Sequence, residues 1–157
     1  MSDRDLGESG RGERPPVFLT RRVNFCASHR YHREAWSVEK NREVFGPCNN
    51  PYGHGHNYSL EVTIGGTIDR ETGMVMNLRD VDEVLRREVV KVFDHRFVNK
   101  EVPGFDTTVP TTENIAIYIW EKVRPFFDTE NSFLERVRLY ETPEIYADVL
   151  REEADLA

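Results

Sequence analysis

The sequence has little cysteine and no long apolar run. Its two cysteines, Cys26 and Cys48, could pair, but one bridge would not hold together a secreted chain of 157 residues. This argues against a disulfide scaffold, and we expect a cytoplasmic protein with both thiols reduced. No apolar stretch approaches the roughly 18 to 20 residues of a membrane-spanning helix, which argues against a helical membrane protein.

Positive charge is also scarce. There are 21 Lys and Arg residues against 28 Asp and Glu, and the formal net charge is −7. A general nucleic-acid binder would need a basic field, although a local cluster of cations could still bind an anionic small molecule. Residues 1–16 carry seven charges and only two apolar side chains, Met1 and Leu6. They lack the apolar stretch of a signal peptide, and we expect a disordered leader there.

Apolar periodicity predicts a single α+β domain over residues 17–150, followed by an acidic tail at 151–157. The predicted strands are 17–29, 56–69, 132–142 and 144–150. The predicted helices are a short one at 37–46, one at 77–93, and one that begins at Thr111 or Thr112 and is stopped by Pro125. Two strands, two main helices and two strands in this order predict a four-stranded antiparallel sheet with two helices on one face.

The stretch CNNPYGHGHNY, residues 48–58, contains two histidines separated by one glycine. Residues i and i+2 of a strand project to the same face, so His54 and His56 could point at one ion. His29, at the end of the first strand, is the natural third ligand if the two strands are neighbours. Three imidazoles with an open fourth position are typical of catalytic zinc. The alternative is that His54 and His56 are polar loop residues near a turn. We assign His32 to a polar loop, because no partner lies at ligand spacing from it.

Cys48 could be a fourth zinc ligand, a buried inert thiol, or a reactive group beside the metal. A reactive thiol needs a group that holds it as thiolate, such as zinc or a His-Asp pair. Asp94 and His95, at the end of helix 77–93, could form such a pair. Neighbouring residues of a helix point in different directions, however, and His95 could simply interact with the helix dipole.

Five motifs in order, FCASH, CNNPYGHGHNY, FDHR, PTTEN and LYET, closely resemble the 6-pyruvoyl-tetrahydropterin synthase family from about Val17 to Val149. The resemblance implies the tunnelling fold, ββααββ, and a barrel-like homo-oligomer, typically a hexamer of two trimers. It implies a zinc-dependent carbon-oxygen lyase that converts 7,8-dihydroneopterin triphosphate to 6-pyruvoyl-tetrahydropterin and eliminates triphosphate.

Two alternatives stay open within that fold. One is the related 6-carboxy-tetrahydropterin synthase of deazapurine biosynthesis, although the gap between Cys48 and the histidines, with NNP inside it, resembles the tetrahydrobiopterin branch more. The other is a zinc-binding or pterin-binding module without catalysis.

The resemblance also implies roles for individual residues. The implied zinc ligands are His29, His54 and His56. The implied catalytic residues are Cys48, as proton-abstracting base, and Asp94 with His95, supplied by a neighbouring subunit to activate it. The implied pterin-binding residues are Glu141, which anchors the ring, and Thr111, Thr112 and Glu113, which help to seat it.

Two points remain outside the resemblance. The family more often has a small polar residue at position 26, and we expect Cys26 to be packed and inert on the strand face opposite His29. Cations for the triphosphate are not assigned; those near the metal motifs in sequence are Arg21, Arg22, Arg30, Lys40 and Arg42.

Overall fold

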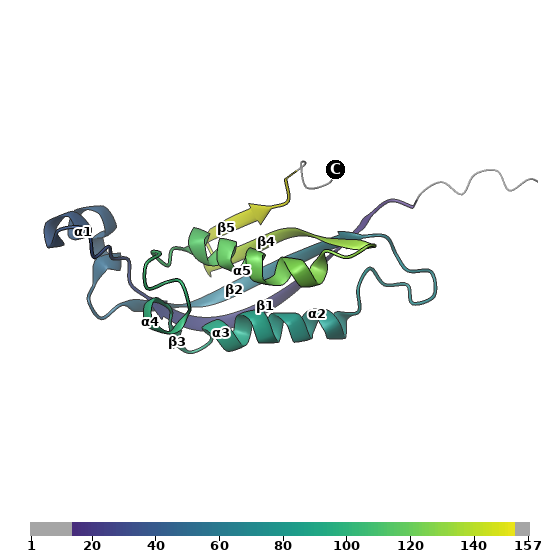
Figure 1. The fold of residues 1–157 in the computed structure, drawn as a ribbon, viewed down its shortest axis with the longest axis horizontal. Helices are drawn as coiled ribbons and strands as arrows, with labels where there is room; N and C mark the ends of the chain where they lie inside the picture. Colours follow the sequence, from purple (N-terminus) through teal and green to yellow (C-terminus); the bar gives the residue numbers. More distant parts are fainter. Residues whose placement is uncertain (1–13, 153–157) are drawn as a thin grey trace, which may run out of the picture.

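A computed structural model describes residues 14–152 of the chain, which form a five-stranded sheet with helices on one side (Figure 1). The strands are β1 (Val17–His29), β2 (His54–Gly66), β3 (Arg96–Phe97), β4 (Ser132–Thr142) and β5 (Ile145–Leu150). The helices are α1 (Val38–Phe45), α2 (Leu78–Leu85), α3 (Lys91–Phe93), α4 (Val98–Glu101) and α5 (Thr112–Phe127). The predicted leader, 1–16, and tail, 151–157, fall largely on residues 1–13 and 153–157, which lie outside the described residues.

The strand order is β3-β1-β2-β4-β5, and every pairing is antiparallel except that of β3 with β1. The predicted α+β class is confirmed, but the predicted four-stranded sheet is wrong by one short strand. The two residues of β3 pair in parallel with Ala27 and Ser28 of β1. Two residues are too few to show the alternating pattern by which a strand is found in a sequence.

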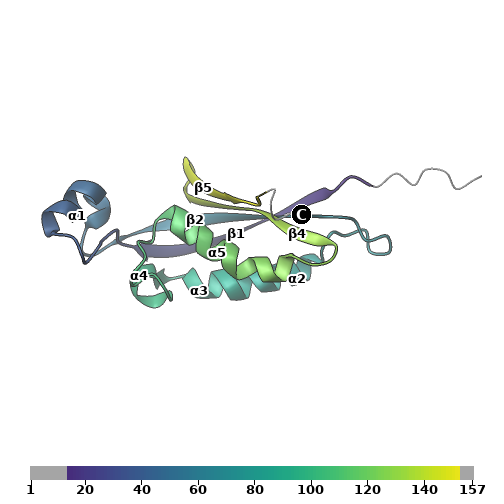
Figure 2. The same cartoon turned by 45° about the horizontal axis from the view of Figure 1, so that its top comes forward.

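β1 and β2 pair along their whole length, from Val17 opposite Gly66 to His29 opposite His54. Figure 2 shows α2, α3 and α5 on the same side of the sheet. The strand residues that face these helices and the apolar stripes of the helices share one core, whose largest members include Tyr58, Leu60, Ile64, Leu85, Phe93, Ile115, Ile119, Phe127, Leu134 and Leu139. The far end of the β1–β2 pair projects beyond the core toward α1 (Figure 1).

The predicted helix 77–93 is present, with a π-helical turn, Arg86–Val90, between α2 and α3. Asn77 caps it by accepting a hydrogen bond from the amide of Arg79 at 3.0 Å, as expected of an Asn at this position. A π turn holds one residue more than an α-helical turn, which shifts the face that the following residues present. It lets both Leu85 and Phe93 reach the core, where each is fully buried.

The prediction that Pro125 stops the last main helix is wrong, because α5 runs to Phe127. Proline lacks one amide proton, which costs a single helical hydrogen bond in this last turn. Phe127 is fully buried in the core, and the amide of Asp128 still bonds to the Arg124 carbonyl at 2.9 Å. Packing therefore holds the turn that the proline weakens.

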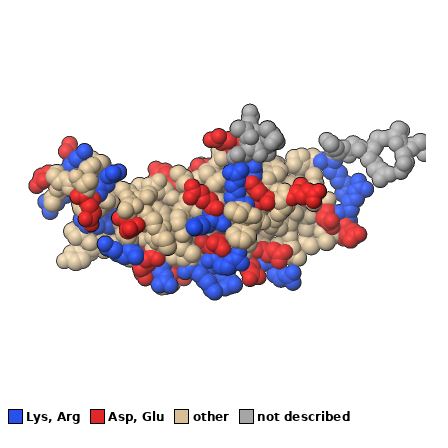
Figure 3. All heavy atoms as spheres, in the orientation of Figure 1, with Lys and Arg blue, Asp and Glu red and all other residues tan. Residues whose placement is uncertain are grey.

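Charges of both signs are intermixed over the face shown in Figure 3, without a continuous basic area there. Within residues 14–152, no helix combines the length and the apolar character needed to cross a bilayer.

Candidate metal centre and active site

Three histidines meet where β1 ends and β2 begins. The strand register places His29 opposite His54, and His56 follows two residues later on the same face. The Nε2 atoms of His29 and His54 are 3.1 Å apart, and one ring nitrogen from each of the three histidines lies within 4.8 Å of the others. The structure thus brings together the three residues singled out as metal ligands.

The turn that leads into β2 depends on glycine. Gly53 has a φ of 69°, in the left-handed region, and a Cβ at this position would lie 2.9 Å from the His29 carbonyl oxygen. Any other residue would therefore push β2 away from the end of β1. Because His54 is the next residue, this turn sets the spacing of the histidine pair.

His29 is held as a neutral imidazole with one nitrogen free for a ligand. It is fully buried, and burial lowers its pKa to about 4. Its Nδ1 lies 2.8 Å from the Pro110 carbonyl oxygen, so Nδ1 carries the proton and donates it there. The lone pair is left on Nε2, which points at His54. A second hydrogen bond that fixes the ring is typical of metal-binding histidines.

His56 offers an observation that fits a metal ion directly. Its Nε2 atom is buried and has no hydrogen-bond partner among the described residues, and Oε1 of Glu141 lies 3.4 Å away. Burial also lowers the pKa of His56 below its usual value, which favours the neutral ring. A buried polar atom without a partner is unfavourable, and a cation would satisfy it. Three imidazole nitrogens form a donor set that suits zinc.

Glu141, near the end of β4, is the carboxylate beside the histidines. Its side chain is 14% exposed. Thr112 donates its hydroxyl to Oε2 in a short hydrogen bond, and Tyr31 donates to the same oxygen at 3.4 Å. Thr112 comes from the first turn of α5, so the strand and the helix fix the carboxylate from two sides. The structure brings Glu141 and Thr112 together, as the roles implied for them require.

The two neighbours of Thr112 do less at this site. Thr111 is the N-cap of α5 and accepts a hydrogen bond from the amide of Asn114 at 3.2 Å. Its side chain starts the helix, which in turn places Thr112. Glu113 is exposed.

Tyr31 is a site residue that sequence reasoning missed. Its hydroxyl reaches Glu141, its ring centroid lies 5.0 Å from that of His29, and its amide donates to the Cys48 carbonyl at 2.9 Å. It therefore contacts the metal triad, the carboxylate and the cysteine loop. Strand alternation carried two residues beyond His29 could have found it, because residues 29 and 31 share a face in extended chain.

Cys48 lies in a 3₁₀ turn, Gly46–Asn49, and is half-buried. Burial raises the pKa of its thiol, and the negative charge of Glu141 raises it further. In the isolated chain Cys48 is therefore a thiol. To act as a thiolate it needs a nearby positive charge or a base.

Asp94 and His95 form a pair beside β1, on the edge of the strand that faces β3 and not β2. Asp94 Oδ2 lies 2.9 Å from Nδ1 of His95, and its Oδ1 accepts the Cys26 amide at 2.9 Å. These two contacts, the Cys26 amide first, hold the pKa of Asp94 below its usual value. The pair meets although its members are neighbours in sequence, because the helix ends at Phe93 and His95 has a φ of 59°.

The pair does not meet Cys48 within one chain. The His95 side chain is 83% exposed, and no hydrogen bond or ion pair within residues 14–152 joins Asp94 or His95 to Cys48. The structure of the single chain thus assembles the histidine triad with Glu141, and it places the Asp94–His95 pair elsewhere.

The expectation that Cys26 is packed is wrong. Cys26 lies on the face opposite Phe25 and Ala27, as strand alternation predicts, but it is exposed. The helices cover only one face of the sheet, so a residue on the opposite face stays open in a single chain (Figure 2).

Comparison with known proteins shows the relatives of this chain. A sequence model of the family "6-pyruvoyl tetrahydropterin synthase" matches residues 18–152. The chain is 45% identical to the 6-pyruvoyl tetrahydrobiopterin synthase of Drosophila melanogaster over 131 residues, which are 83% of this chain and 77% of that protein. It is 42% identical to the protein of the same name from Homo sapiens over 137 residues, 87% of this chain and 93% of the human one.

A solved structure is similar over nearly the same range. The structure of Caenorhabditis elegans 6-pyruvoyl tetrahydropterin synthase matches with a TM-score of 0.81 and 38% identity, covering 88% of this chain and 97% of that one. The expected tunnelling fold is confirmed, and β3 is an addition to the four-stranded sheet that was predicted. The chain belongs to the 6-pyruvoyl tetrahydropterin synthase family.

Proposed function

We propose that the protein is an enzyme that converts 7,8-dihydroneopterin triphosphate to 6-pyruvoyl-tetrahydropterin and triphosphate. The observation that carries the proposal is the convergence of His29, His54 and His56 beside a carboxylate held by two hydroxyl groups and next to the loop of Cys48. The names of its relatives support the proposal over the 6-carboxy alternative. A module that only binds would not need the cysteine and the Asp94–His95 pair.

The reaction needs no external oxidant or reductant. A side-chain proton is removed, the carbon–oxygen bond to triphosphate breaks, and the electron pair leaves with the triphosphate. Proton shifts then convert the side chain to a diketone while the pterin ring gains the two hydrogens that the side chain loses. The enzyme must therefore hold the ring, acidify the side chain and move protons.

The residues of the chain divide these tasks. A zinc ion held by His29, His54 and His56 would act as a Lewis acid on the side-chain hydroxyls. Glu141 accepts the 2-amino group and the ring N–H of the pterin together, in a planar two-bond contact. A ring without those donors would leave the carboxylate without partners, which gives specificity for pterins.

Cys48 removes and returns the side-chain protons. Because burial and Glu141 raise its pKa, it needs help to lose its own proton. The Asp94–His95 pair gives this help from a neighbouring subunit, with His95 as the base and Asp94 holding its ring. The active enzyme is therefore a homo-oligomer, a hexamer of two trimers in our proposal, and it works in the cytoplasm with both of its thiols reduced.

Product identification tests the proposal. Purified zinc-loaded protein is mixed anaerobically with 7,8-dihydroneopterin triphosphate, and the products are followed by mass spectrometry. We expect a 6-pyruvoyl pterin together with triphosphate, and none of either from the metal-stripped protein. A 6-carboxy pterin with acetaldehyde would assign the protein to the deazapurine branch. Tight pterin binding without any product would leave a binding module.

A further inference from the structure

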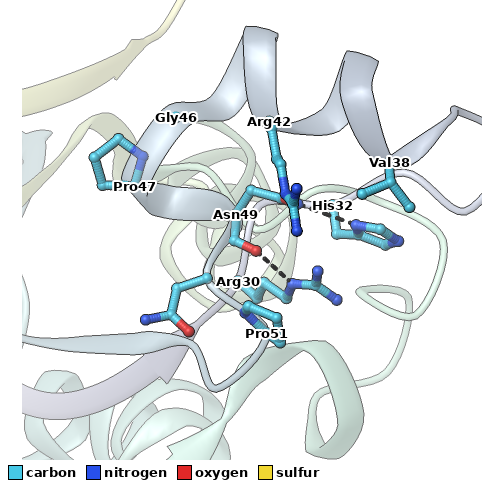
Figure 4. A pocket seen from close by; sticks show the side chains of 9 residues that line it. Arg30, His32, Val38, Arg42, Gly46, Pro47, Asn49 and Pro51 are labelled. Carbon is cyan, nitrogen blue, oxygen red and sulfur yellow. Dashed lines mark hydrogen bonds between the residues drawn. The ribbon is translucent and has the colours of Figure 1, made fainter.

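Beside the turn that contains Cys48 lies an open hollow of about 440 Å³ (Figure 4). It is lined by Arg30 and His32, just after β1, by α1 and by the turn that follows α1. Two arginines and a histidine face it, Arg30, Arg42 and His32, and none of its lining residues is an Asp or a Glu. Figure 4 shows the two guanidinium groups and the imidazole directed into the same space. This hollow has a cationic wall in a chain whose net charge is negative.

Arg30 is built into that wall. Its backbone amide donates to Oδ1 of Asn99 at 2.8 Å, and its carbonyl accepts Nδ2 of the same residue at 2.8 Å. Its guanidinium Nε donates to the Asn49 carbonyl at 2.9 Å. With both backbone and Nε fixed, the two terminal nitrogens of the guanidinium are presented in a set direction. A guanidinium group that is already held in position loses little side-chain entropy when it binds an anion.

His32 is oriented by the same residue. Asn49 is 6% exposed, and its Nδ2 donates to the Tyr31 carbonyl at 2.8 Å and to Nδ1 of His32 at 3.0 Å. Because an amide nitrogen only donates, Nδ1 of His32 is the acceptor and the ring proton sits on Nε2. The free edge of His32 is thus a hydrogen-bond donor.

Neither arginine has a counter-ion in the described part of the chain. Most arginines there pair with carboxylates, for example Arg21 with Asp82 and Arg138 with Asp148, but no Asp or Glu of residues 14–152 forms an ion pair with Arg30 or Arg42. Glu34 and Asp106 line a separate hollow, which Arg30, His32 and Lys100 also border. A half-buried guanidinium without a counter-ion favours an anionic ligand.

The hollow adjoins the proposed active site through two residues. Cys48 stands between Pro47 and Asn49, which both line the hollow, while its thiol lies within electrostatic reach of Glu141. Tyr31 stands between Arg30 and His32 and turns the other way, with its ring against His29. A ligand that begins at Glu141 and passes Cys48 would end at the arginines.

We propose that this hollow binds the triphosphate group of the substrate, with Arg30, Arg42 and His32 as donors. The inference rests on the proposed function. Triphosphate leaves as a polyanion with the electron pair of the broken carbon–oxygen bond, while a side-chain proton is taken up by Cys48. Fixed cations stabilise the charge that develops on the leaving oxygen, as well as the bound substrate. Both kcat and KM should therefore respond to the arginines.

Binding of inorganic tripolyphosphate to the zinc-loaded full-length protein tests the hollow without any turnover. In calorimetric titrations, Arg42→Gln should bind tripolyphosphate roughly tenfold more weakly than wild type, and Arg30→Gln at least as weakly, because each loses a charged hydrogen bond. Arg42 is exposed and makes no ion pair within the described residues, so its variant should fold. Any contribution from the zinc is common to all variants and does not change the comparison.

The matched control is Arg70→Gln, which makes the same charge change at an exposed residue of the loop between β2 and α2, at the other end of the molecule (Figure 1). It should bind tripolyphosphate like wild type. Affinity for 7,8-dihydroneopterin, which lacks phosphate, should be the same in all four proteins. Unchanged tripolyphosphate affinity in both Arg30→Gln and Arg42→Gln would overturn the inference, and so would an equal loss in Arg70→Gln.

This experiment separates the two proposals. If tripolyphosphate binding depends on Arg30 and Arg42 but wild type forms no 6-pyruvoyl product, the anion site stands and the proposed reaction fails. If wild type forms the product and both variants match it in kcat/KM and in tripolyphosphate affinity, the reaction stands and the anion site fails.

Discussion

The chain carries two groups of reactive side chains on two sides of β1, and they are held in different ways. The histidine triad with Glu141 combines a buried His29 with three half-buried side chains, comes from paired strands and meets within one chain. The Asp94–His95 pair is exposed at the edge of the sheet next to Cys26. Strand pairing can finish a metal site inside a subunit, whereas a pair at a sheet edge can act on a residue of another subunit. The comparison teaches that a single chain assembles the two groups apart, and in the proposed function they act together only across two subunits.

The test with the largest expected effect places the intact Cys48 and the intact His95 in different subunits. Cys48→Ala and His95→Ala should each lower kcat by about 10²–10⁴-fold, as loss of an acid–base group does, and both should keep their zinc. If Cys48 and His95 of one active site come from different subunits, subunits of the two variants that are dissociated and reassembled together should regain about one quarter of wild-type activity, because a quarter of random interfaces unite intact Cys48 with intact His95.

Activity and zinc content of the mixed oligomers give the measurement. Mixing Cys48→Ala with itself is the control and should stay inactive. No recovery in a mixture whose subunits have demonstrably exchanged would place both residues of an active site in the same chain.

A second test measures how the stability of the zinc-free protein depends on pH through His29. Burial lowers the pKa of His29 to about 4, whereas an unfolded histidine titrates near 6.5. Between these values the unfolded chain binds a proton that the folded chain does not, so stability falls as pH falls from about 6.5 to 4. The loss for the zinc-free protein is about 3 kcal/mol from this residue.

Urea unfolding of the zinc-free protein across this pH range measures the effect. Other groups titrate there too, so the informative quantity is the difference from His29→Gln, whose pH dependence should be flatter. Equal slopes for wild type and His29→Gln would contradict the prediction.

Glu141→Gln sharpens the comparison by changing the carboxylate alone. The side chain keeps its size, but one oxygen becomes a donor facing the donors of the pterin. A charged hydrogen bond contributes about 1.5–3 kcal/mol, so affinity for 7,8-dihydroneopterin should fall by roughly 10- to 100-fold. Fluorescence titration measures it, with Glu130→Gln, an exposed residue of the turn between α5 and β4, as the matched control. An affinity equal to that of wild type would move the ring anchor away from Glu141.

Tyr31→Phe should have the smallest effect. It keeps the ring that packs on His29 and removes only the hydroxyl that donates to Glu141 at 3.4 Å. This hydrogen bond to a carboxylate is long, and we assign it about 1 kcal/mol, so KM should rise roughly fivefold while kcat and zinc content hold. Tyr31→Leu, which also removes the ring, should give a larger change. A fall in kcat with constant KM in Tyr31→Phe would assign the hydroxyl a role in proton transfer instead.

Much of the fold was predictable because its strands and helices carry long apolar patterns. β1 and β4 have the predicted bounds, and the helix predicted at 77–93 is where the pattern places it. The misses are short or depend on packing. β3 is too brief to leave a pattern, and buried Phe127 keeps a turn helical that proline disfavours.

The site follows the same division. His29, His54 and His56 could be grouped from strand spacing because pairing and alternation are regular. The exposure of Cys26 could not be read from its face alone, since what covers a sheet face is decided by distant helices. Tyr31 was missed because it lies beyond the end of β1, in a segment whose direction is set by its bond to the Cys48 carbonyl.

Because of the π-helical turn Arg86–Val90, the position of Asp94 depends on the number of residues in this helix. In evolutionary terms such a turn is a one-residue insertion within a helix. Deleting one of its residues would restore regular α-helical hydrogen bonds and leave the residues after it in register, so Phe93 would stay in the core and Asp94 beside the Cys26 amide. A second deletion would have no extra residue to remove and would turn everything after it by about 100°. The helix should therefore tolerate the loss of one residue at this turn, whereas the loss of two would disconnect the acid–base pair.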